Sequence, residues 1–565
     1  MADSQKKEKR NNRKYIFVVG GVMSGVGKGV AASSIAAILK GRGLSVTALK
    51  IDPYINVDAG TMNPTEHGEV FVLREGLETD QDMGNYERFL GQDIPDINYM
   101  TTGSVYQSVI RKERNLEYGG KNVEVVPHIP EEVIGRIKRA AEVADADVAL
   151  IEIGGTVGEY QNVLFLEAVR MMKSEAPDDV AVVLVSYLPV PGSIGEMKTK
   201  PTQTAARILN STGVFADFII ARAPVPVDEK RKEKMARFCN VRAEHVISAP
   251  DVKSVYDVPL RFEADGLSQK ICDTLGLRVK PSNLKAWKTF VARSKNGSDT
   301  VKIAVVGKYF SSGDFVLSDV YLSVLEAIKY SAYHQNLKPD IHYLSSSDFS
   351  DKKKLKKLKE YDGVLIPGGF GTTGIDGKLN VIEYVRKNKI PYFGICYGMQ
   401  LAVLEYSKNK LKLPDPSTAE IKPTAKNLVV DIMPEQKEKL ATSDMGGTMR
   451  LGEYTAKLKK GTIAYSSYSG AGYKLTPDNH KLISERHRHR YEVNPEYIER
   501  LERGGLVFSG RSPDGRLMEI VELPHEVHPF FVGVQFHPEF HARPLSPHPL
   551  FTAFVKAAYE GRRLK

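Results

Sequence analysis

Runs of apolar residues alternate with helical patterns along most of this sequence. The first run, YIFVV at residues 15–19, is followed by a glycine-rich loop and an alanine-rich helical pattern over residues 30–39. A second apolar run comes directly afterwards, at residues 45–51. Strand, helix and strand within about 35 residues form a βαβ unit, which requires parallel strands. The start of the chain therefore predicts a parallel sheet covered by helices.

The same alternation continues and divides the chain into two domains. Buried-strand patterns at residues 148–153, 180–186 and 218–221 extend the first sheet, and a new strand pattern begins at residue 301. We predict an α/β protein with two doubly wound, Rossmann-like domains and mostly parallel sheets. The expected segments are a basic flexible tail (1–14), a first domain (15–280), a linker without clear periodicity (281–300) and a second domain (301–565).

Composition and charge argue against a membrane protein, a secreted protein and a nucleic-acid-binding protein. No apolar run approaches the ~20 residues that cross a bilayer, and the N-terminal residues lack the apolar core of a secretory signal. We therefore expect a cytoplasmic protein with no membrane partner. The net charge of +10 is spread along the chain with little aromatic interleaving, so it fits polyphosphate substrates better than nucleic acid. The three cysteines form no CxxC pair, so we expect neither a disulfide framework nor a structural metal site.

A glycine-rich loop, GGVMSGVGKG at residues 20–29, lies between the first strand and the first helix. Glycines allow backbone N–H groups to close around phosphate oxygens, and the helix N-terminus adds a positive dipole end. Lys28 would reach the β- and γ-phosphates. The strict P-loop pattern has Gly where Val22 stands and Ser or Thr where Gly29 stands, so the usual hydroxyl ligand of Mg²⁺ is missing.

Carboxylates elsewhere must then hold the metal ion. Glu152 lies near the end of the strand pattern at residues 148–153, and Asp82 lies in the segment ETDQD. A carboxylate at the carboxyl edge of a central parallel strand faces the ligand crevice of such folds. Either acid alone would more often be solvated or salt-bridged, but beside a nucleotide loop without its own ligand we predict that both bind Mg²⁺.

A second motif, PYFGICYGMQ at residues 391–400, predicts a strand, a sharp turn and a helix. Gly394 and Gly398 flank Cys396 in the spacing of a nucleophile elbow, which exposes the sulfur at a helix N-terminus that favours thiolate. The upstream segment PGGFG, at residues 367–371, ends another strand and can supply an oxyanion donor.

A base for this cysteine lies near the C-terminus, in the segment VQFHPE. His537 would accept the thiol proton, and Glu539 would hold the tautomer of His537. A lone cysteine is more often a buried structural residue. The motifs together reverse that expectation and predict a catalytic triad of Cys396, His537 and Glu539, which resembles that of class I glutamine amidotransferases.

Nearly the whole chain resembles the CTP synthase family. The segments that carry the resemblance in the first half are KIDPYINVD (50–58), GTMNP (60–64), HGEVFV (67–72), YERF (86–89), RKER (111–114), EIGGTVG (152–158), KTKPTQ (198–203) and FCNV (238–241). In the second half they are DMGGTMRLG (444–452) and ERHRHRYEVN (485–494). This series, in this order, is far more specific than the loop alone.

The resemblance implies an ATP-dependent synthase domain followed by a class I glutamine amidotransferase domain. ATP would phosphorylate the 4-oxygen of UTP, and ammonia freed from glutamine at Cys396 would travel inside the protein and displace that phosphate, giving CTP. Mg²⁺ as cofactor, GTP as an allosteric activator and a homotetramer with nucleotide sites at subunit interfaces are implied as well.

Family roles carry over to the positions that match these motifs. The implied ATP-binding residues are Ser24, Gly25, Val26, Gly27, Lys28, Gly29, Lys50 and Asp82. The implied UTP- and CTP-binding residues are Ser24, Glu159, Tyr160, Gln161, Lys198, Thr199, Lys200, Gln203 and Lys234. The implied glutamine-binding residues are Gly369, Tyr397, Gln400, Glu420 and Arg490.

The sequence departs from the family pattern at places tied to regulation. Residues 159–162 read EYQN where the family has Asp-Ile-Glu-Ser, in a region that binds pyrimidine nucleotide. Residues 372–376 read TTGID, so that the arginine tied to GTP activation is replaced by Thr373. Gly119 and Gly120 replace the usual Leu-Gly near the proposed ammonia route. We expect intact catalysis with altered regulation.

Three alternatives stay open at the level of sequence. A cobyric acid synthase type of amidotransferase would share both halves, but it does not require the segment at residues 198–203. A catalytically silent scaffold is conceivable because relatives assemble into filaments, and loss of Lys28 or of the triad would have favoured it. A role in nucleic-acid binding rests only on net charge.

Overall fold

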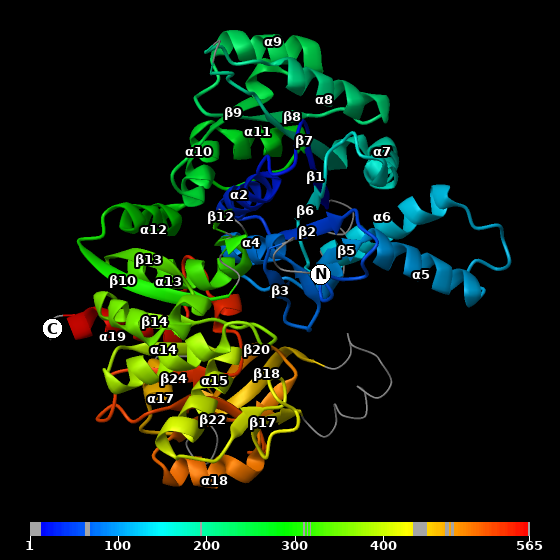
Figure 1. Cartoon of the computed structure of the whole chain (residues 1–565). Coiled ribbons are helices and arrows are strands. Elements are labelled where there is room, and N and C mark those ends of the chain that lie inside the picture. Colours follow the sequence, from blue (N-terminus) through cyan, green and yellow to red (C-terminus); the bar gives the residue numbers. More distant parts are fainter. Residues whose placement is uncertain are drawn as a thin grey trace. The chain divides into compact units, whose positions relative to one another are not determined.

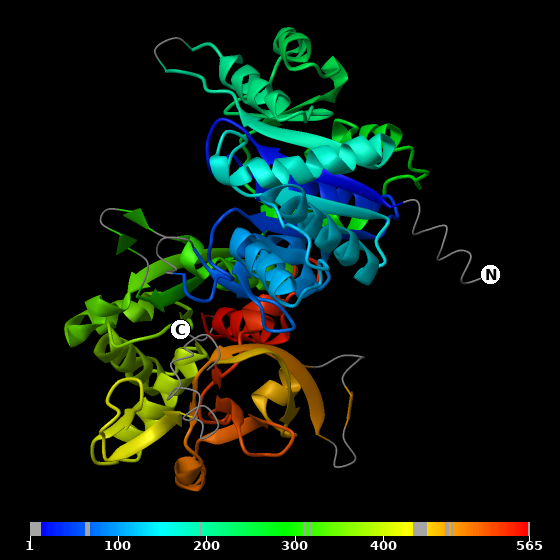
Figure 2. The same cartoon turned by 90° about the vertical axis from the view of Figure 1, so that its right-hand side faces the viewer.

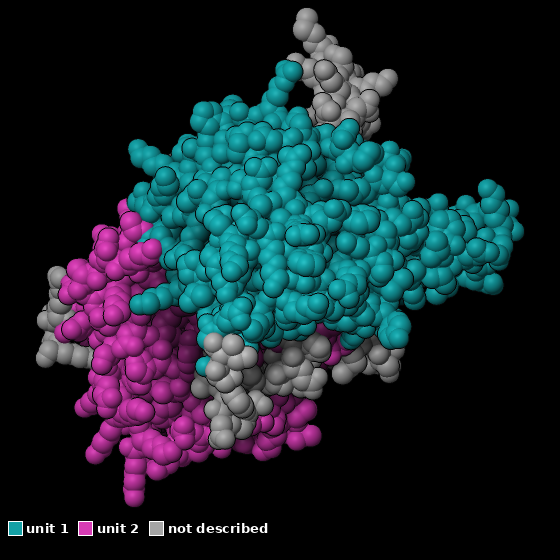
Figure 3. Space-filling model, turned by 90° about the horizontal axis from the view of Figure 1, so that it is seen from above, with its two compact units in different colours: residues 1–59, 82–291 teal, residues 60–81, 292–565 magenta. Residues whose placement is uncertain are grey.

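The computed structural model (Figure 1) describes residues 13–562 except for 63–67, 193–194, 309–310, 313–314, 317, 433–448, 469–473 and 476–479. Almost all of the predicted basic tail, and residues 444–448 of one family motif, lie outside the described residues. The chain divides into two compact units (Figure 3). The first unit comprises Met1–Ala59 and Asp82–Val291, and the second comprises Gly60–Gln81 and Ala292–Lys565.

The first unit is built on a parallel sheet whose neighbouring strands all run in the same direction. In spatial order its strands are β5 (Tyr99–Thr101), β2 (Val46–Asp52), β6 (Val148–Ile153), β1 (Lys14–Gly20), β7 (Val180–Tyr187), β8 (Phe218–Ala223) and β9 (Val246–Pro250). Strands β2, β6 and β1 are buried on both faces, as their continuous apolar runs predict. The first strand lies in the middle of the order, which is the doubly wound arrangement expected from the sequence.

Helices follow these strands and cover the sheet (Figure 2). The helices of the first unit are α2 (Lys28–Gly41), α4 (Gln81–Leu90), α5 (Thr102–Arg114), α6 (Val125–Val143), α7 (Val163–Glu175), α8 (Lys200–Ser211), α9 (Glu229–Cys239), α10 (Val258–Ala264), α11 (Leu267–Thr274) and most of α12 (Lys285–Lys295). The last of these falls within the segment predicted as a linker. It buries Trp287, Phe290 and Val291, an apolar face too short to give a clear period in the sequence.

The sheet of the second unit joins a parallel half to an antiparallel half. The parallel strands, in spatial order, are β13 (Leu337–Ser345), β10 (Asp299–Gly307), β14 (Gly363–Ile366), β15 (Tyr392–Ile395) and β24 (Phe531–Val534). The antiparallel strands continue as β23 (Met518–Glu522), β22 (Val507–Arg511), β18 (Arg450–Leu458), β20 (Lys481–His489) and β19 (Lys474–Leu475). The α/β class is confirmed, and the antiparallel half is an addition that the sequence pattern did not reveal.

Smaller elements complete the second unit. Its helices are α13 (Leu322–His334), α14 (Ile375–Lys387), α15 (Tyr397–Glu405), α17 (Ile463–Ser467), α18 (Pro495–Arg503) and α19 (Pro549–Arg562). The short strands are β3 (Val70–Val72), β4 (Glu78–Asp80), β11 (Ser311–Ser312), β12 (Phe315–Val316), β16 (Pro416–Thr418), β17 (Asn427–Ile432) and β21 (Tyr491–Val493). In the part of the chain that the structure describes, no helix is long and apolar enough to cross a membrane.

Candidate functional site

The loop between β1 and α2 follows the path of a phosphate-binding loop. Gly27, with φ 89°, precedes the first residue of α2, so the helix N-terminus opens onto the loop. Val22, where the strict pattern has glycine, also adopts a positive φ of 79°. The backbone therefore keeps the conformation that glycine favours even where the sequence departs from the pattern. Lys28 Nζ donates a hydrogen bond to the carbonyl oxygen of Gly155 at 2.8 Å, and burial lowers the pKa of Lys28.

A buried charge cluster lies beside this loop, at the carboxyl edge of the sheet. Strand register places Lys50 of β2 opposite Glu152 of β6, with Lys50 Nζ 3.1 Å from Glu152 Oε1. The same ammonium group pairs with Asp82 and lies 3.6 Å from Asp52 Oδ1. Burial disfavours its charge, but Asp82, Glu152 and Asp52 outweigh burial and raise the pKa of Lys50 well above its usual value.

The two predicted metal ligands converge at the first turn of α2. A Cβ added to Gly29 would clash with the carboxylate of Asp82 and would lie 3.6 Å from Glu152 Oε2. The carboxylates therefore occupy the space that a Ser or Thr side chain would take, which explains physically why Gly29 stands there. Burial raises the pKa of Glu152, whereas the Lys50 ammonium overcomes burial and lowers that of Asp82. Two adjacent carboxylate oxygen ligands fit Mg²⁺.

The sequence predicted neither Asp52 nor Tyr86 as a member of this cluster. The Tyr86 hydroxyl donates a hydrogen bond to Glu152, and Asp52 accepts one from the Tyr54 hydroxyl at 3.0 Å. Both residues lie in segments that carry the family resemblance. Only the register of the strands and the position of α4 bring them to Lys50.

The predicted pyrimidine-binding residues lie in four places of the first unit, and one of them, Ser24, belongs to the phosphate loop. Glu159 accepts hydrogen bonds from the Thr156 N–H at 2.8 Å and from Gln161 Nε2 at 2.7 Å. A Cβ on Gly155, the partner of Lys28, would lie 2.6 Å from Glu159 Oε2, so this group adjoins the phosphate loop. Tyr160 is 97% exposed.

The remaining pyrimidine candidates lie on α8, on the two residues before it, and on α9. Lys198 Nζ is 2.6 Å from Glu196 Oε2, and the charges of Lys198, Arg231 and Lys234 all lower the pKa of Glu196. Lys198 and Lys234 are thus brought into one basic group, as expected for residues that bind a triphosphate. Thr199 precedes the first residue of α8, Lys200 begins it, and Gln203 Nε2 donates a hydrogen bond to Thr199 Oγ1 at 3.0 Å.

A cavity of about 170 Å³ opens beside Gly27, and sequence reasoning missed it. Its apolar lining includes Ile220, Val252 and Phe262, and its polar lining includes Arg222, Ser248 and Asp251. Arg222 Nη2 donates a hydrogen bond to Asp251 Oδ1 at 2.7 Å. A largely apolar pocket with a few polar groups next to a phosphate loop suits a purine base.

Cys396 forms the predicted elbow. It lies between β15 and α15 with φ 50° and ψ −101°, a strained conformation that costs on the order of 1–3 kcal/mol. A Cβ on Gly394 would lie 2.8 Å from the carbonyl carbon of Gly398, and one on Gly398 would clash with the Ile366 carbonyl oxygen. Both flanking positions therefore need glycine, as the motif predicts.

The three parallel strands β14, β15 and β24 bring the triad together. Ile395 pairs with Val534, so that Cys396 and the segment leading to His537 leave the same edge of the sheet. His537 Nδ1 lies 2.7 Å from Glu539 Oε1. A Cβ on Gly368 would lie 2.8 Å from His537 Cε1 and 3.6 Å from Cys396 Cβ, which places the predicted oxyanion loop against both groups.

The electrostatics of the triad favour proton transfer from the thiol. Burial lowers the pKa of His537, but Glu539 and Cys396 outweigh burial and raise it to about 10. His537 is therefore a strong base toward the Cys396 proton and, once charged, an acid for a leaving amine. Gln535 was missed in the sequence, although it lies in the same motif. Its Nε2 is 3.7 Å from Cys396 Sγ, and its Oε1 accepts a hydrogen bond from Gln400 at 3.3 Å.

Several predicted glutamine-binding residues lie around the oxyanion loop at residues 367–371. Glu420 accepts a hydrogen bond from the Gly371 N–H, and the Tyr397 hydroxyl donates one to the Gly371 carbonyl oxygen at 3.1 Å. The pKa of Glu420 is raised, because the effect of burial outweighs the opposing effect of nearby cations, of which Arg490 is one. A cation and a carboxylate side by side match the α-carboxylate and α-amino groups of an amino acid.

Lys378 lies unexpectedly deep beneath this loop. Its side chain is fully buried, its Nζ lies 5.3 Å from the centre of the Tyr397 ring, and no described residue accepts a hydrogen bond from it. Burial and, to a smaller extent, repulsion by Lys308 lower its pKa from 10.5 to about 7, although Glu420 opposes this.

We expect Lys378→Met to stabilise the protein most at acidic pH. Below about pH 7 the folded state must hold a buried charge. Between pH 7 and 10.5 the unfolded chain binds a proton that the folded state does not, so the stability of the parent protein rises with pH. The gain from methionine should reach a few kcal/mol below pH 7 and vanish near pH 10.5. Denaturant unfolding at several pH values measures it, with exposed Lys387→Met as the control. A gain that does not change with pH would contradict the assignment.

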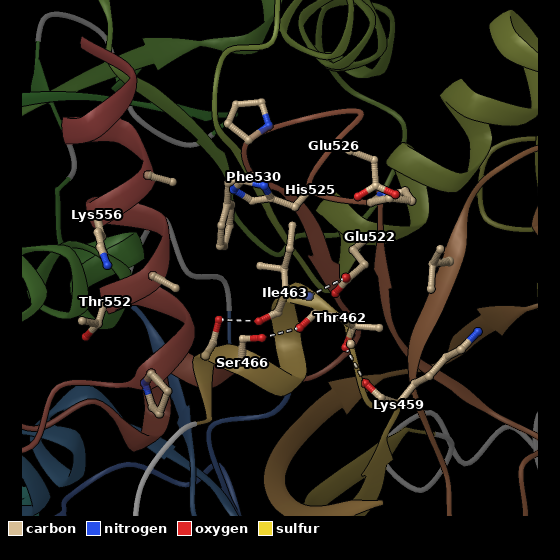
Figure 4. Close-up of a pocket in the computed structure, with 18 of the residues that line it drawn as sticks. Lys459, Thr462, Ile463, Ser466, Glu522, His525, Glu526, Phe530, Thr552 and Lys556 are labelled. Atoms are coloured by element: carbon tan, nitrogen blue, oxygen red, sulfur yellow. Dashed lines mark hydrogen bonds between the residues drawn. The ribbon is translucent and has the colours of Figure 1, made fainter. Parts of the chain in front are cut away.

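A larger cavity, in the second unit, lies elsewhere (Figure 4). Its volume is about 880 Å³, and its lining contains none of the predicted site residues. Glu522 in its wall accepts hydrogen bonds from the N–H groups of Ile463 and Ala464, and Ser466 donates one to the Thr462 carbonyl oxygen. These groups are satisfied within the fold, so size alone does not mark this hollow as the reaction site.

Comparisons with known proteins identify a family for each half of the chain. The sequence model for the CTP synthase N-terminus matches residues 14–277, and that for class I glutamine amidotransferase matches residues 316–557. A CTP synthase of Halalkalibacterium halodurans is 46% identical over 546 residues, which cover 96% of this chain and 99% of the relative. A CTP synthase of Pyrococcus furiosus is 47% identical over 554 residues, which cover 98% of this chain and 99% of the relative. The solved glutaminase domain of Trypanosoma brucei CTPS with bound acivicin is 35% identical, covers 46% of this chain and 94% of that chain, and has a TM-score of 0.41. With relatives so similar over almost its whole length, the chain belongs to the CTP synthase family.

Proposed function

We propose that this chain converts UTP to CTP, using ATP and the amide nitrogen of glutamine. One observation carries the proposal: a single chain of this family holds a buried Lys–carboxylate cluster beside a phosphate loop and, in its other unit, a Cys396–His537–Glu539 triad. The cobyric acid synthase alternative is not favoured, because the relatives that cover nearly the whole chain are CTP synthases. The scaffold alternative loses its basis, because both sets of reactive groups are present.

The first unit supplies phosphoryl transfer. The 4-oxygen of UTP would attack the γ-phosphorus of ATP, releasing ADP and leaving a phosphate ester on the pyrimidine. Lys28 and Lys50 would neutralise the transferring group, which is how proteins accelerate this reaction. Asp82 and Glu152 would hold Mg²⁺, which balances phosphate charge when bound. The described residues contain no group of three or more metal-binding side chains, so nucleotide phosphates and water would complete the coordination.

The second unit supplies ammonia. His537 would take the thiol proton, and the resulting thiolate of Cys396 would attack the glutamine amide carbon. N–H groups of the loop at residues 368–371 would receive the developing oxyanion. His537 then returns the proton to the leaving nitrogen, and water hydrolyses the thioester to glutamate. Ammonia attacks C4 of the phosphorylated UTP and displaces phosphate.

Assembly, regulation and location extend the proposal beyond the chain itself. The family resemblance supports a homotetramer with shared nucleotide sites, a cytoplasmic location and GTP as an activator. Sedimentation of the purified protein with and without UTP and ATP tests the tetramer.

The direct test of the activity supplies UTP, ATP, Mg²⁺ and glutamine and follows CTP by chromatography. CTP, ADP and glutamate should form in equal amounts. Glutaminase and ATPase activity with another acceptor, but no CTP from UTP, would contradict the proposal.

We expect weak activation by GTP. The family arginine that would meet GTP is here the exposed Thr373, a neutral side chain with one donor instead of five. Losing a charge-assisted hydrogen bond costs roughly 1.5–3 kcal/mol, about 10- to 100-fold in affinity. Lys378 is too deeply buried to replace it. GTP titrations of glutamine-dependent CTP formation, for the parent chain and for Thr373→Arg, measure the difference. The expectation would be contradicted if the parent chain were activated at low GTP concentrations and Thr373→Arg did not lower the GTP concentration required.

A further inference from the structure

A hairpin from the first half of the sequence belongs to the glutaminase unit. Strands β3 and β4 pair antiparallel, with Phe71 opposite Thr79. Arg486 of β20 donates a hydrogen bond to the Val72 carbonyl oxygen at 3.1 Å, and the Glu453 N–H donates one to the Arg74 carbonyl oxygen at 2.8 Å. Backbone and side-chain bonds therefore fasten the hairpin to two strands of the large sheet.

The hairpin also reaches the residue beside the nucleophile. Arg488 Nε lies 2.7 Å from Glu78 Oε1, and the two side chains are only 13% and 5% exposed. A buried pair of this kind is geometrically rigid, because each partner would be costly to leave unpaired. The guanidinium group of Arg488 is thus held in place by a carboxylate from another part of the chain.

Arg488 joins three parts of the glutaminase site. Its guanidinium group lies over the ring of Phe370, 5.2 Å from the ring centre, and Phe370 belongs to the predicted oxyanion loop. Its carbonyl oxygen accepts a hydrogen bond from Cys396 Sγ at 3.7 Å. One residue therefore contacts the hairpin, the loop and the thiol.

We propose that Arg488 is a positioning residue of the glutaminase and that Glu78 of the hairpin holds it in position. The proposal rests on the role of Cys396 given above. The strand ladder of β20 keeps the Arg488 carbonyl oxygen at the thiol. The ion pair with Glu78 keeps the guanidinium group against Phe370 of the oxyanion loop. Without the charge of Glu78 the guanidinium group is held less firmly, and the loop loses this support.

Glu78→Gln tests the proposal, because it keeps the shape and removes the charge. We expect kcat for glutamine hydrolysis to fall at least tenfold with KM within about threefold, since Arg490 is untouched. The rate of CTP formation from ammonia should stay within about twofold of that of the parent protein. The melting temperature should stay within a few degrees of the parent value. Glu78→Asp, which keeps the charge, should recover part of the loss.

A matched control and a double variant make the test specific. Arg74 lies on the same hairpin and pairs with Glu453, but its side chain is 59% exposed. Arg74→Gln should leave glutamine hydrolysis within twofold. Glu78→Gln combined with Arg488→Gln should be no worse than Arg488→Gln alone, because the two act as one pair.

Normal glutamine hydrolysis in Glu78→Gln would overturn the proposal. Equal losses in Glu78→Gln and Arg74→Gln, or a parallel loss of ammonia-dependent synthesis, would overturn it as well, because they indicate general disruption of the hairpin. Failure of the proposed function is distinguishable, since the parent protein itself would then form no CTP from UTP or hydrolyse no glutamine.

Discussion

Replacing Cys396 with alanine should abolish CTP formation from glutamine and leave CTP formation from free ammonia intact. Removing the nucleophile of a triad costs roughly 10⁴-fold or more in kcat. Cys396 belongs to the second unit, whereas Lys28, Lys50, Asp82 and Glu152 belong to the first. The variant should therefore lose only its ammonia supply. Parallel assays with glutamine and with ammonium chloride, at a pH that provides NH₃, measure the difference.

Cys239→Ala is the matched control for this variant. Cys239 is buried on α9, and burial raises the pKa of its thiol to about 11, so it has no reactive thiolate at neutral pH. We expect it to keep activity with both nitrogen sources. If Cys396→Ala keeps its melting curve but is inactive with ammonia as well, the division of labour between the two units is wrong.

The reactive groups could be predicted from the sequence because each lies within a short motif. The glycines around Cys396 are required by contacts within one strand–turn–helix segment, and His537 orients against Glu539, which is two residues away. Glu152 could be predicted from its place near the end of a strand pattern, whereas its pairing with Lys50 follows only from the strand register.

Long-range packing could not be predicted in this way. The sequence pattern did not predict the short strands at residues 70–72 and 78–80. It also does not indicate that their hairpin packs on β18 and β20, roughly 400 residues further along the chain. The cavity beside Gly27 depends on α10 and β9 meeting the loop, and Asp52 depends on the strand register. Lys378 looks like an exposed helical lysine in the sequence, and only the fold reveals its burial.

Lys28→Ala should remove CTP formation from either nitrogen source, because both need the phosphorylated 4-oxygen of UTP. Lys28 is 9% exposed, begins α2 and donates a hydrogen bond to the Gly155 carbonyl oxygen at the edge of the Lys50 cluster. Removing a positioned cation from a phosphoryl-transfer site costs about 3–5 kcal/mol of transition-state stabilisation, roughly 10²- to 10⁴-fold in rate. CTP formation with ammonia and with glutamine measures the loss.

Lys28→Ala should still hydrolyse glutamine, because the triad of the second unit is unchanged, so the two half-reactions become uncoupled. Lys40→Ala is the control on the same helix. Lys40 lies near the other end of α2 and donates hydrogen bonds to the Leu90 carbonyl oxygen at 2.6 Å and to Gln92 Oε1 at 2.9 Å. Removing it takes away a cation and two hydrogen bonds but nothing that would face a phosphate, so CTP formation should persist. Near-normal synthesis from ammonia in Lys28→Ala would contradict the assignment of this loop to ATP, whereas equal losses in both variants would point to α2 as a whole.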